Sequence, residues 1–272
     1  MRQEDSPEAE RLRSLGGETV PGELLDANSF ADAVKGCEAF IHLVGIIYER
    51  REATFEQVHV RGTLSALGAA AVGGCGRFIF MSALGTGPDA RSAYHRSKWS
   101  AEEAVRGSGI PYTIFRPSTI FGADSELFKM LFQQVRRMPV IPVIGNGRYR
   151  MQPVSVLDVA ACFSECLTND KAVNCVYELG GPEALTYDEV IDTICRVMGK
   201  KRKKFHAPVA LVRPVAWLSE HLQDRPFLTT DQLTMLLNDN ICDIDAMRRE
   251  LGVEPVALAE ALAEALRVAP RL

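Results

Sequence analysis

Arg77-Phe78-Ile79-Phe80-Met81-Ser82 is a short apolar run, and it follows directly on the glycine-rich segment Gly73-Gly74-Cys75-Gly76. Its length and its flanking turn residues are typical of a strand rather than of a helix. Consecutive apolar positions indicate that both faces of this strand are buried, as they are in parallel sheets that helices cover from both sides. The run therefore predicts an α/β protein.

An alternation of helices and strands surrounds this run. The predicted elements are, in order, a strand at 18–21, a helix at 26–35, a strand at 39–44, a helix at 55–71, the strand at 77–82, a helix at 93–106 and a strand at 112–116. Repeated strand-helix-strand units specify a doubly wound parallel sheet with helices on both faces.

The alternation loosens after Gly122. The expected elements are a helix at 125–137, a glycine turn at 145–147, a helix at 156–167, a strand at 175–179 and mainly helical, more charged sequence from 186 onward. We therefore expect a nucleotide-binding domain over 1–185. A smaller helical lobe over 186–272 lies on the substrate side and is partly interleaved with the first domain.

The composition is that of an ordinary globular protein. The chain has 272 residues, 47% of them hydrophobic, and a net charge of -4, which argues against nucleic acid as a partner. The first residues lack the apolar segment of a signal peptide, and no uncharged run of about 18 apolar residues occurs. We expect neither secretion by that route nor a membrane span.

The seven cysteines indicate reduced thiols. They are odd in number, scattered, and contain no Cys-x-x-Cys pair, which is typical of buried cysteines in a cytoplasmic protein. Cys162 and Cys166 lie one helical turn apart and could share a metal, but no histidine is near them. Packing is the favoured interpretation, and no metal site is predicted.

Tyr94-His95-Arg96-Ser97-Lys98 is the first feature with chemical content. Tyr94 and Lys98 share one face of a helix, so the ammonium can lower the pKa of the phenol and hold a ribose hydroxyl. A Tyr-x-x-x-Lys pair is common by chance, but here it begins a helix that follows a parallel strand ending in Ser82. This context favours a catalytic interpretation over an exposed helical pair.

The sequence resembles the short-chain dehydrogenase/reductase superfamily. It is most similar to the atypical group that contains the NAD(P)H-binding accessory subunit of respiratory complex I and its bacterial relatives. The segments that carry the resemblance are GELLD (22–26), AFIHLVG (39–45), VRGT (60–63), FIFMSALG (78–85), YHRSK (94–98), FRPSTIFG (115–122), QPVSVLDVA (152–160) and YELGGP (177–182). The resemblance implies a Rossmann-type fold and a bound NAD or NADP.

The resemblance also implies which residues hold the cofactor. The implied contacts are Glu23 and Leu24 beside the adenine, Leu43, Val44 and Gly45 along the ribose and phosphates, Lys98 at the nicotinamide ribose, and Pro117 and Ser118 at the carboxamide. In catalysis, Tyr94 would donate or accept the proton, Lys98 would orient the ribose, and Ser82 would polarise a substrate carbonyl.

Three departures from the family pattern weaken the case for catalysis. The second hydroxyl that active extended members carry falls on Ala83, and His59 stands in the region where active members often have an asparagine. Ser82 and Tyr94 are twelve positions apart, about half the family's usual spacing. The complete set of four catalytic residues is therefore absent by residue type.

The beginning of the chain also departs from the family. No G-x-x-G-x-x-G turn, which normally supports the pyrophosphate, occurs in the sequence. The first two strands of the usual sheet are missing, so the strand at 39–44 is expected to expose an unpaired edge. We favour a start that lies upstream of Met1 over the alternative that another element or another copy of the chain covers this edge. We expect cofactor binding to be weakened or lost if Met1 is the true start.

These observations leave three functions open. The favoured one is an NAD(P)(H)-binding oxidoreductase or epimerase with an unknown small-molecule substrate. The alternatives are a non-catalytic accessory or assembly factor of respiratory complex I or quinone metabolism, and a truncated product that binds no cofactor. Lys200-Lys201-Arg202-Lys203-Lys204 and the apolar positions that follow, over 205–222, suit an anionic membrane surface. Because Pro208 and Pro214 interrupt that stretch, a solvated run beside a packed helix is the favoured interpretation.

Overall fold

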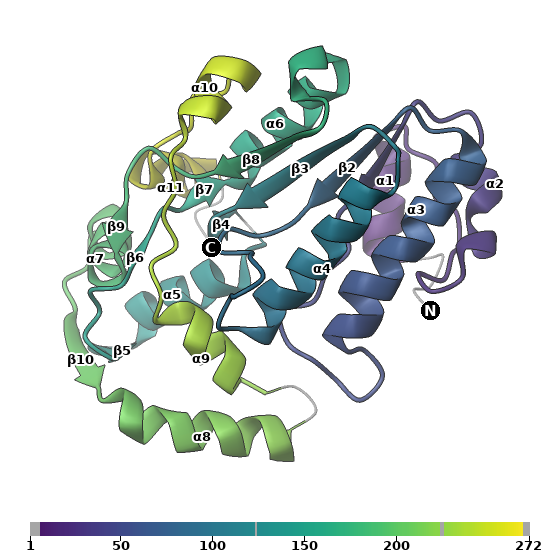
Figure 1. The fold of residues 1–272 in the computed structure, drawn as a ribbon. Coiled ribbons are helices and arrows are strands. Elements are labelled where there is room, and N and C mark those ends of the chain that lie inside the picture. Colours follow the sequence, from purple (N-terminus) through teal and green to yellow (C-terminus); the bar gives the residue numbers. More distant parts are fainter. Residues whose placement is uncertain (1–5, 123, 224–225, 269–272) are drawn as a thin grey trace.

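A four-stranded parallel sheet lies at the centre of the structure, a computed structural model that describes residues 6–122, 124–223 and 226–268. The strands lie in the order β1-β2-β3-β8 and point the same way (Figure 1). Their bounds are β1 (Ala39–His42), β2 (Arg77–Met81), β3 (Tyr112–Pro117) and β8 (Cys175–Leu179). The predicted α/β class and the parallel alignment of the strands predicted at 39–44, 77–82 and 112–116 are confirmed.

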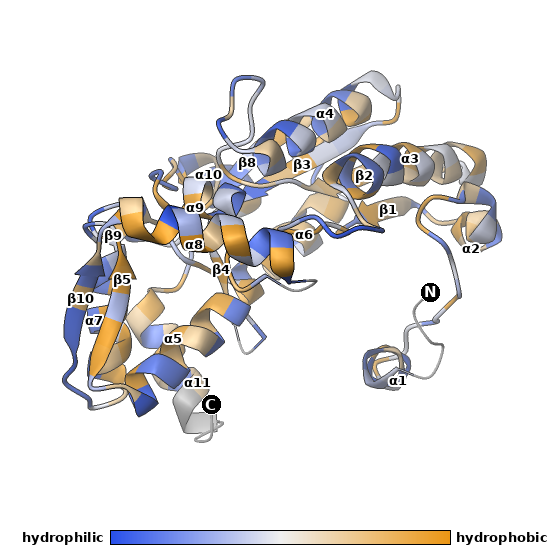
Figure 2. Ribbon diagram, turned by 90° about the horizontal axis from the view of Figure 1, so that it is seen from below, coloured by the Kyte–Doolittle hydropathy of each residue, from blue (hydrophilic) through white to orange (hydrophobic). Residues whose placement is uncertain are grey.

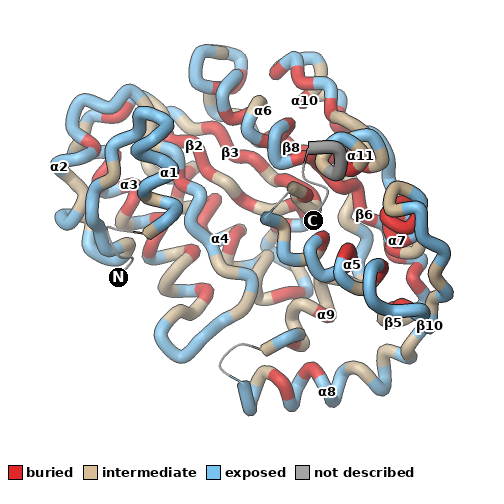
Figure 3. The backbone as a smooth tube through the Cα atoms, turned by 180° about the vertical axis from the view of Figure 1, so that it is seen from behind, coloured by how far each residue is buried: buried red, intermediate tan, exposed pale blue. Residues whose placement is uncertain are grey.

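Side chains of β2 and β3 alternate between two hydrophobic layers. Phe78, Phe80 and Ile114 pack on one face against α3 (Gly62–Gly73) and α4 (Ala93–Gly107). Ile79 and Phe115 pack on the other face, against α6 (Val156–Thr168) and α10 (Asp245–Leu251). Figure 3 shows the resulting buried centre along both strands. Because both faces are covered, the strand sequences are apolar at nearly every position.

The elements before β2 partly follow the prediction. They are α1 (Pro7–Ser14), η1 (Ala27–Ser29), α2 (Ala31–Val34), β1, the π-helix η2 (Glu56–Arg61) and α3. The expected helix at 55–71 is thus an unbroken sequence of two helix types. The expected strand at 18–21 is wrong: those residues form no strand. A strand requires a neighbour to complete its hydrogen bonds, and no described segment pairs with 18–21.

One edge of β1 is open, as expected. β1 pairs only with β2 among the described strands, so its other edge carries unpaired backbone groups. Ile41 points to the sheet face opposite α3 and is 41% exposed, and Leu43 and Val44 beyond the strand are also exposed. β1 therefore has both an unpaired edge and an exposed face.

A second hydrophobic core lies beside the main sheet. It is built from α5 (Glu126–Arg137), β5 (Val140–Ile144), α7 (Tyr187–Val197) and α11 (Leu258–Val268), and β10 (Lys203–Ala207) pairs in parallel with β5. The remaining elements are β4 (Ile120–Phe121), β6 (Arg150–Met151), β7 (Val154–Ser155), η3 (Asp170–Ala172), β9 (Leu185–Thr186), α8 (Val209–Leu222) and α9 (Thr230–Leu236). The division of the chain at 185/186 stays a prediction.

Candidate functional site

The candidate site lies where β1 and β2 end. In open α/β sheets, ligands bind beyond the carboxyl ends of the strands, because the loops that follow the strands converge there. Lys98 reaches this point from α4, and its Nζ donates to the backbone oxygen of Met81 at 3.0 Å. A Cβ added at Gly45 would lie 3.1 Å from Lys98 Nζ, so the loop after β1 approaches the ammonium closely at a residue without a side chain.

Burial determines the protonation of the two helical residues. It lowers the pKa of Lys98 to about 8, against a smaller opposing effect of Glu102. It raises the pKa of Tyr94 to about 12. The sequence predicts that the ammonium lowers the pKa of the phenol; in the structure, burial has the larger effect and acts in the opposite direction. Tyr94 is therefore a protonated phenol at neutral pH.

Aromatic rings enclose the Tyr94 side chain. Its ring packs edge-on against Phe55, His59 and His95, with centroid distances of 5.9, 5.4 and 5.1 Å. Phe55 and His59 stack on each other at 5.3 Å. The position of the phenol is thus fixed from two helical segments, the start of α4 and the π-helix η2.

His59 joins the loop after β1 to α4. Its Nε2 accepts the N–H of Ile46 at 3.0 Å, and its Nδ1 lies 2.8 Å from Ser97 Oγ. Ser97 Oγ in turn donates to the backbone oxygen of Tyr94 at 2.7 Å. This arrangement requires the proton on Nδ1, which then donates to Ser97. Burial lowers the pKa of His59 to about 3, with a further lowering by Lys98, so the ring is neutral.

Ser82 is held by a buried ionic network. Its Oγ donates to Glu102 Oε1 at 2.6 Å. The same carboxylate accepts two hydrogen bonds from Arg116, at 2.9 and 2.7 Å, and one from Arg106 at 2.6 Å. Trp99 lies against both guanidinium groups. The Ser82 hydroxyl therefore points into the protein toward Glu102.

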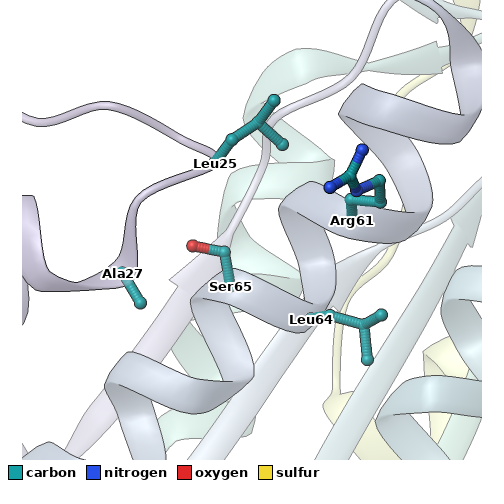
Figure 4. A pocket seen from close by; sticks show the side chains of 5 residues that line it. All are labelled: Leu25, Ala27, Arg61, Leu64 and Ser65. Atoms are coloured by element: carbon teal, nitrogen blue, oxygen red, sulfur yellow. The ribbon is translucent and has the colours of Figure 1, made fainter.

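The residues that the resemblance implies for the adenine lie at the start of α3. Leu24 is partly buried and packs on Gly62, where an added Cβ would meet its side chain at 2.8 Å, and Glu23 is exposed. Beside them is a recess of about 350 Å³ (Figure 4). Its lining residues are Leu25, Ala27, Arg61, Leu64 and Ser65.

Pro117 and Ser118 are buried where β3 meets the C-terminal part of the chain. Ser118 Oγ donates to Asn240 Oδ1 at 2.6 Å, and Asn240 Nδ2 donates to the backbone oxygen of Leu84 at 3.3 Å. Pro117 O accepts the N–H of Leu84 at 2.9 Å. The structure thus brings Ser118 next to the loop that follows Ser82.

Sequence reasoning missed two residues that shape the site, Asn240 and Asp231. Asp231 in α9 accepts the backbone N–H groups of Ala93 and Tyr94, at 2.7 and 3.1 Å, through its two carboxylate oxygens. A carboxylate at this place also faces the positive end of the α4 dipole. No local signal marks Asp231, because its partners lie more than 130 positions earlier in the chain.

The cysteines Cys162 and Cys166 lie in the core under β3, and burial raises the pKa of both thiols. Over the residues that the structure describes, no group of three or more His, Cys, Asp or Glu side chains is arranged to hold a metal ion.

Two curated relatives match most of the chain. The alpha subcomplex subunit 9 of mitochondrial NADH dehydrogenase [ubiquinone] 1 from Arabidopsis thaliana is 30% identical over 93% of this chain and 66% of its own length. The ceramide reductase of Caulobacter vibrioides is 33% identical over 72% of this chain and 61% of its own length. The chain thus spans less than two thirds of the length of these relatives.

A solved structure supports the same fold. The NADPH-dependent quinone oxidoreductase QOR2 of Escherichia coli, complexed with NADPH, superposes with a TM-score of 0.72 at 18% identity, covering 95% of this chain and 87% of that one. The family profile described as "NAD dependent epimerase/dehydratase family" matches residues 1–180. Because this match covers most of the chain, including the strands and the Tyr94 helix, the protein belongs to the NAD-dependent epimerase/dehydratase family.

Proposed function

We propose that the chain binds a nicotinamide dinucleotide, NAD or NADP, across the carboxyl ends of β1 and β2, with the nicotinamide ribose against Lys98 and Tyr94. The observation that carries the proposal is the meeting of Lys98 Nζ, the Met81 carbonyl and the Gly45 backbone at one point. Membership of the family and the NADPH of the Escherichia coli structure support this class of cofactor.

The residues present suit a ribose. An ammonium group has three N–H donors, and within the described part of the chain one of them is directed to Met81 O. Two donors therefore remain for ribose hydroxyls. Gly45 leaves the approach to Nζ open, since any side chain there would contact the ammonium at 3.1 Å.

Tyr94 and Lys98 support a proton-transfer role. The bound cofactor would supply hydride transfer. Tyr94 holds a proton at its hydroxyl, and its high pKa means that it releases this proton only to a strongly basic oxygen such as a developing alkoxide. Lys98 orients the ribose and favours the phenolate that is left. These roles fit an oxidoreductase or epimerase that acts on a small molecule with a carbonyl or hydroxyl group.

A second candidate is an accessory role in a respiratory complex, in which bound nucleotide is structural. The observation that favours it is the engagement of Ser82 with Glu102, together with Ala83 at the neighbouring position, because neither then offers a hydroxyl to a substrate carbonyl. The Arabidopsis thaliana relative is named as a subunit of NADH dehydrogenase.

Binding is tested by titrating NADH and NADPH into the protein and measuring heat release and thermal shift. We expect saturable binding of one of them, and Lys98→Met to weaken it at least tenfold, because the ribose loses its charged donor. Lys35→Met, at an exposed lysine directly after α2, is the matched control and leaves the affinity unchanged. Absence of binding by the folded wild-type chain would support the third hypothesis, a product without cofactor.

Catalysis and accessory function are separated by Tyr94→Phe. The variant keeps the ring packing and removes the proton. Loss of turnover with retained dinucleotide affinity supports the enzyme. Full biological activity of Tyr94→Phe, with binding intact, supports the accessory role.

A further inference from the structure

Helix α8 lies at the edge of the molecule and has few contacts with it. It starts directly after β10, through Pro208, and continues without interruption past Pro214. Only Ala216 and Ser219 are buried. Its packing partner is α9, to which Glu220 is joined by accepting the N–H of Thr230 at 2.8 Å. Pro214 therefore does not interrupt the helix, although the sequence predicts that it does.

The outward side of α8 is an apolar stripe. Leu211, Val215, Leu218 and Leu222 follow one another at the spacing of one helix face, and each is between 49% and 74% exposed. Trp217 is more than half exposed on an adjoining side of α8. Figure 2 shows apolar turns along α8 that alternate with hydrophilic ones. We call Leu211, Val215, Leu218 and Leu222 the α8 stripe.

Positive charge lies along the strand that leads into α8. Lys200, Lys201 and Lys203 are exposed just before or at the start of β10, and Arg213 is exposed on the side of α8 away from the stripe. Over the described ranges, no ion pair is formed by any of these four side chains. The exposed ring of Phe205, on the same strand face as Lys203, extends the apolar surface toward the lysines.

Acidic groups near this surface are already engaged. Asp192 pairs with Lys204 at 2.7 Å, and Asp188 pairs with His206 at 3.0 Å, on the opposite face of β10. Glu220 is held by Thr230. The surface that α8 and the start of β10 present is thus apolar and cationic, although the whole chain carries a net charge of -4.

We propose that the α8 stripe rests on the surface of a bilayer that contains anionic lipids, with its leucines among the acyl chains and the lysines at the headgroups. An exposed apolar helix face with a tryptophan and adjacent lysines has the composition of helices that lie in the plane of a membrane interface. In the described ranges, no helix is both long and apolar enough to cross a bilayer. The contact is therefore peripheral, and it is independent of the proposed dinucleotide function.

The distribution of charge favours an anionic bilayer over a second copy of the chain as the partner of α8. A symmetric dimer across α8 would cover the apolar side chains but would give the lysines no partner of opposite charge. An anionic bilayer accepts apolar and cationic groups at the same time, and its surface potential attracts each lysine.

Sedimentation with vesicles tests the proposal. The probes are phosphatidylcholine vesicles with and without 30% phosphatidylglycerol, at low and at high salt. We expect at least fivefold more bound protein with the anionic vesicles at low salt, and partial release at high salt. Leu218→Glu and Leu211→Glu should each reduce binding at least fivefold. Val72→Glu, at an exposed valine of α3, is the matched control and should bind like the wild type.

Tryptophan fluorescence places the contact at α8. Brominated anionic lipids should quench the wild type, and Trp217→Phe should lose most of this quenching although Trp99 remains. Equal binding to neutral vesicles, no binding, or unchanged binding of folded Leu218→Glu would overturn the proposal. A concentration-dependent dimer that Leu218→Glu dissociates, seen by light scattering without lipid, would assign the α8 stripe to a second copy instead.

Discussion

His59 combines complete burial with a neutral ring that is hydrogen-bonded at both nitrogens. Its pKa is about 3 in the folded protein and about 6.5 in an unfolded chain. Between these values the unfolded chain binds more protons, so the stability due to His59 is complete above pH 6.5 and is lost as the pH falls toward 3. The full loss amounts to roughly 5 kcal/mol.

We therefore predict that His59→Gln flattens this acid dependence. The amide keeps hydrogen-bonding capacity but does not titrate. The free energy of unfolding, measured in urea from pH 7 to pH 4, should fall less steeply in His59→Gln than in the wild type. Equal slopes in the two proteins would contradict the assigned protonation of the ring. His221→Gln, at an exposed histidine of α8, serves as the control.

Glu102 links two elements, because it joins α4 to β3 through Arg116. Removing one member of a buried ion pair leaves an uncompensated charge, which typically costs about 3–5 kcal/mol. We predict a loss of this size for Glu102→Ala, measured by urea denaturation. Glu103→Ala, the exposed neighbour that pairs with Arg106, should cost less than about 1 kcal/mol. Similar losses for the two variants would argue against the network as a stabilising link between α4 and β3.

Sequence pattern predicts those helices and strands whose formation depends on neighbouring residues in the chain. Phe78, Ile79 and Phe80 are apolar without a gap, and this alone predicts a strand between two helical layers, as found. The prediction of a strand at 18–21 was wrong because a strand needs a neighbouring strand to pair with, and local sequence does not reveal whether one is present. Tyr94 and Lys98 were found from their spacing, but whether they and the other predicted site residues act as proposed stays a prediction.

Contacts between distant segments were beyond the reach of sequence pattern. Asn240 reaches Ser118, and Asp231 reaches the first amides of α4, only because the chain folds back on itself. The pKa of Tyr94 was predicted with the wrong sign, since the rings that bury it come from η2 as well as from α4. Burial depends on the assembled fold, so the spacing of two residues in the sequence does not predict it.

In the whole molecule, β1 and β8 are the two edge strands of the sheet, and β1 pairs only with β2. Open amides exchange with solvent faster than paired ones. We predict that backbone hydrogens of 39–42 exchange well before those of 77–81, measured by mass spectrometry. Ile41→Lys should change stability by less than about 1 kcal/mol, whereas Ile79→Lys should unfold the chain. Protection of 39–42 equal to that of 77–81 would show that another chain covers the edge.

The two hydrogen bonds that Asp231 accepts from α4 couple α9 mechanically to α4. Its two oxygens hold two successive amides, so a tilt of α9 that breaks one bond strains the other. α9 is also hydrogen-bonded to α8, because Glu220 accepts the N–H of Thr230. A displacement of α8 would thereby be transmitted through two sets of hydrogen bonds to the backbone of Tyr94.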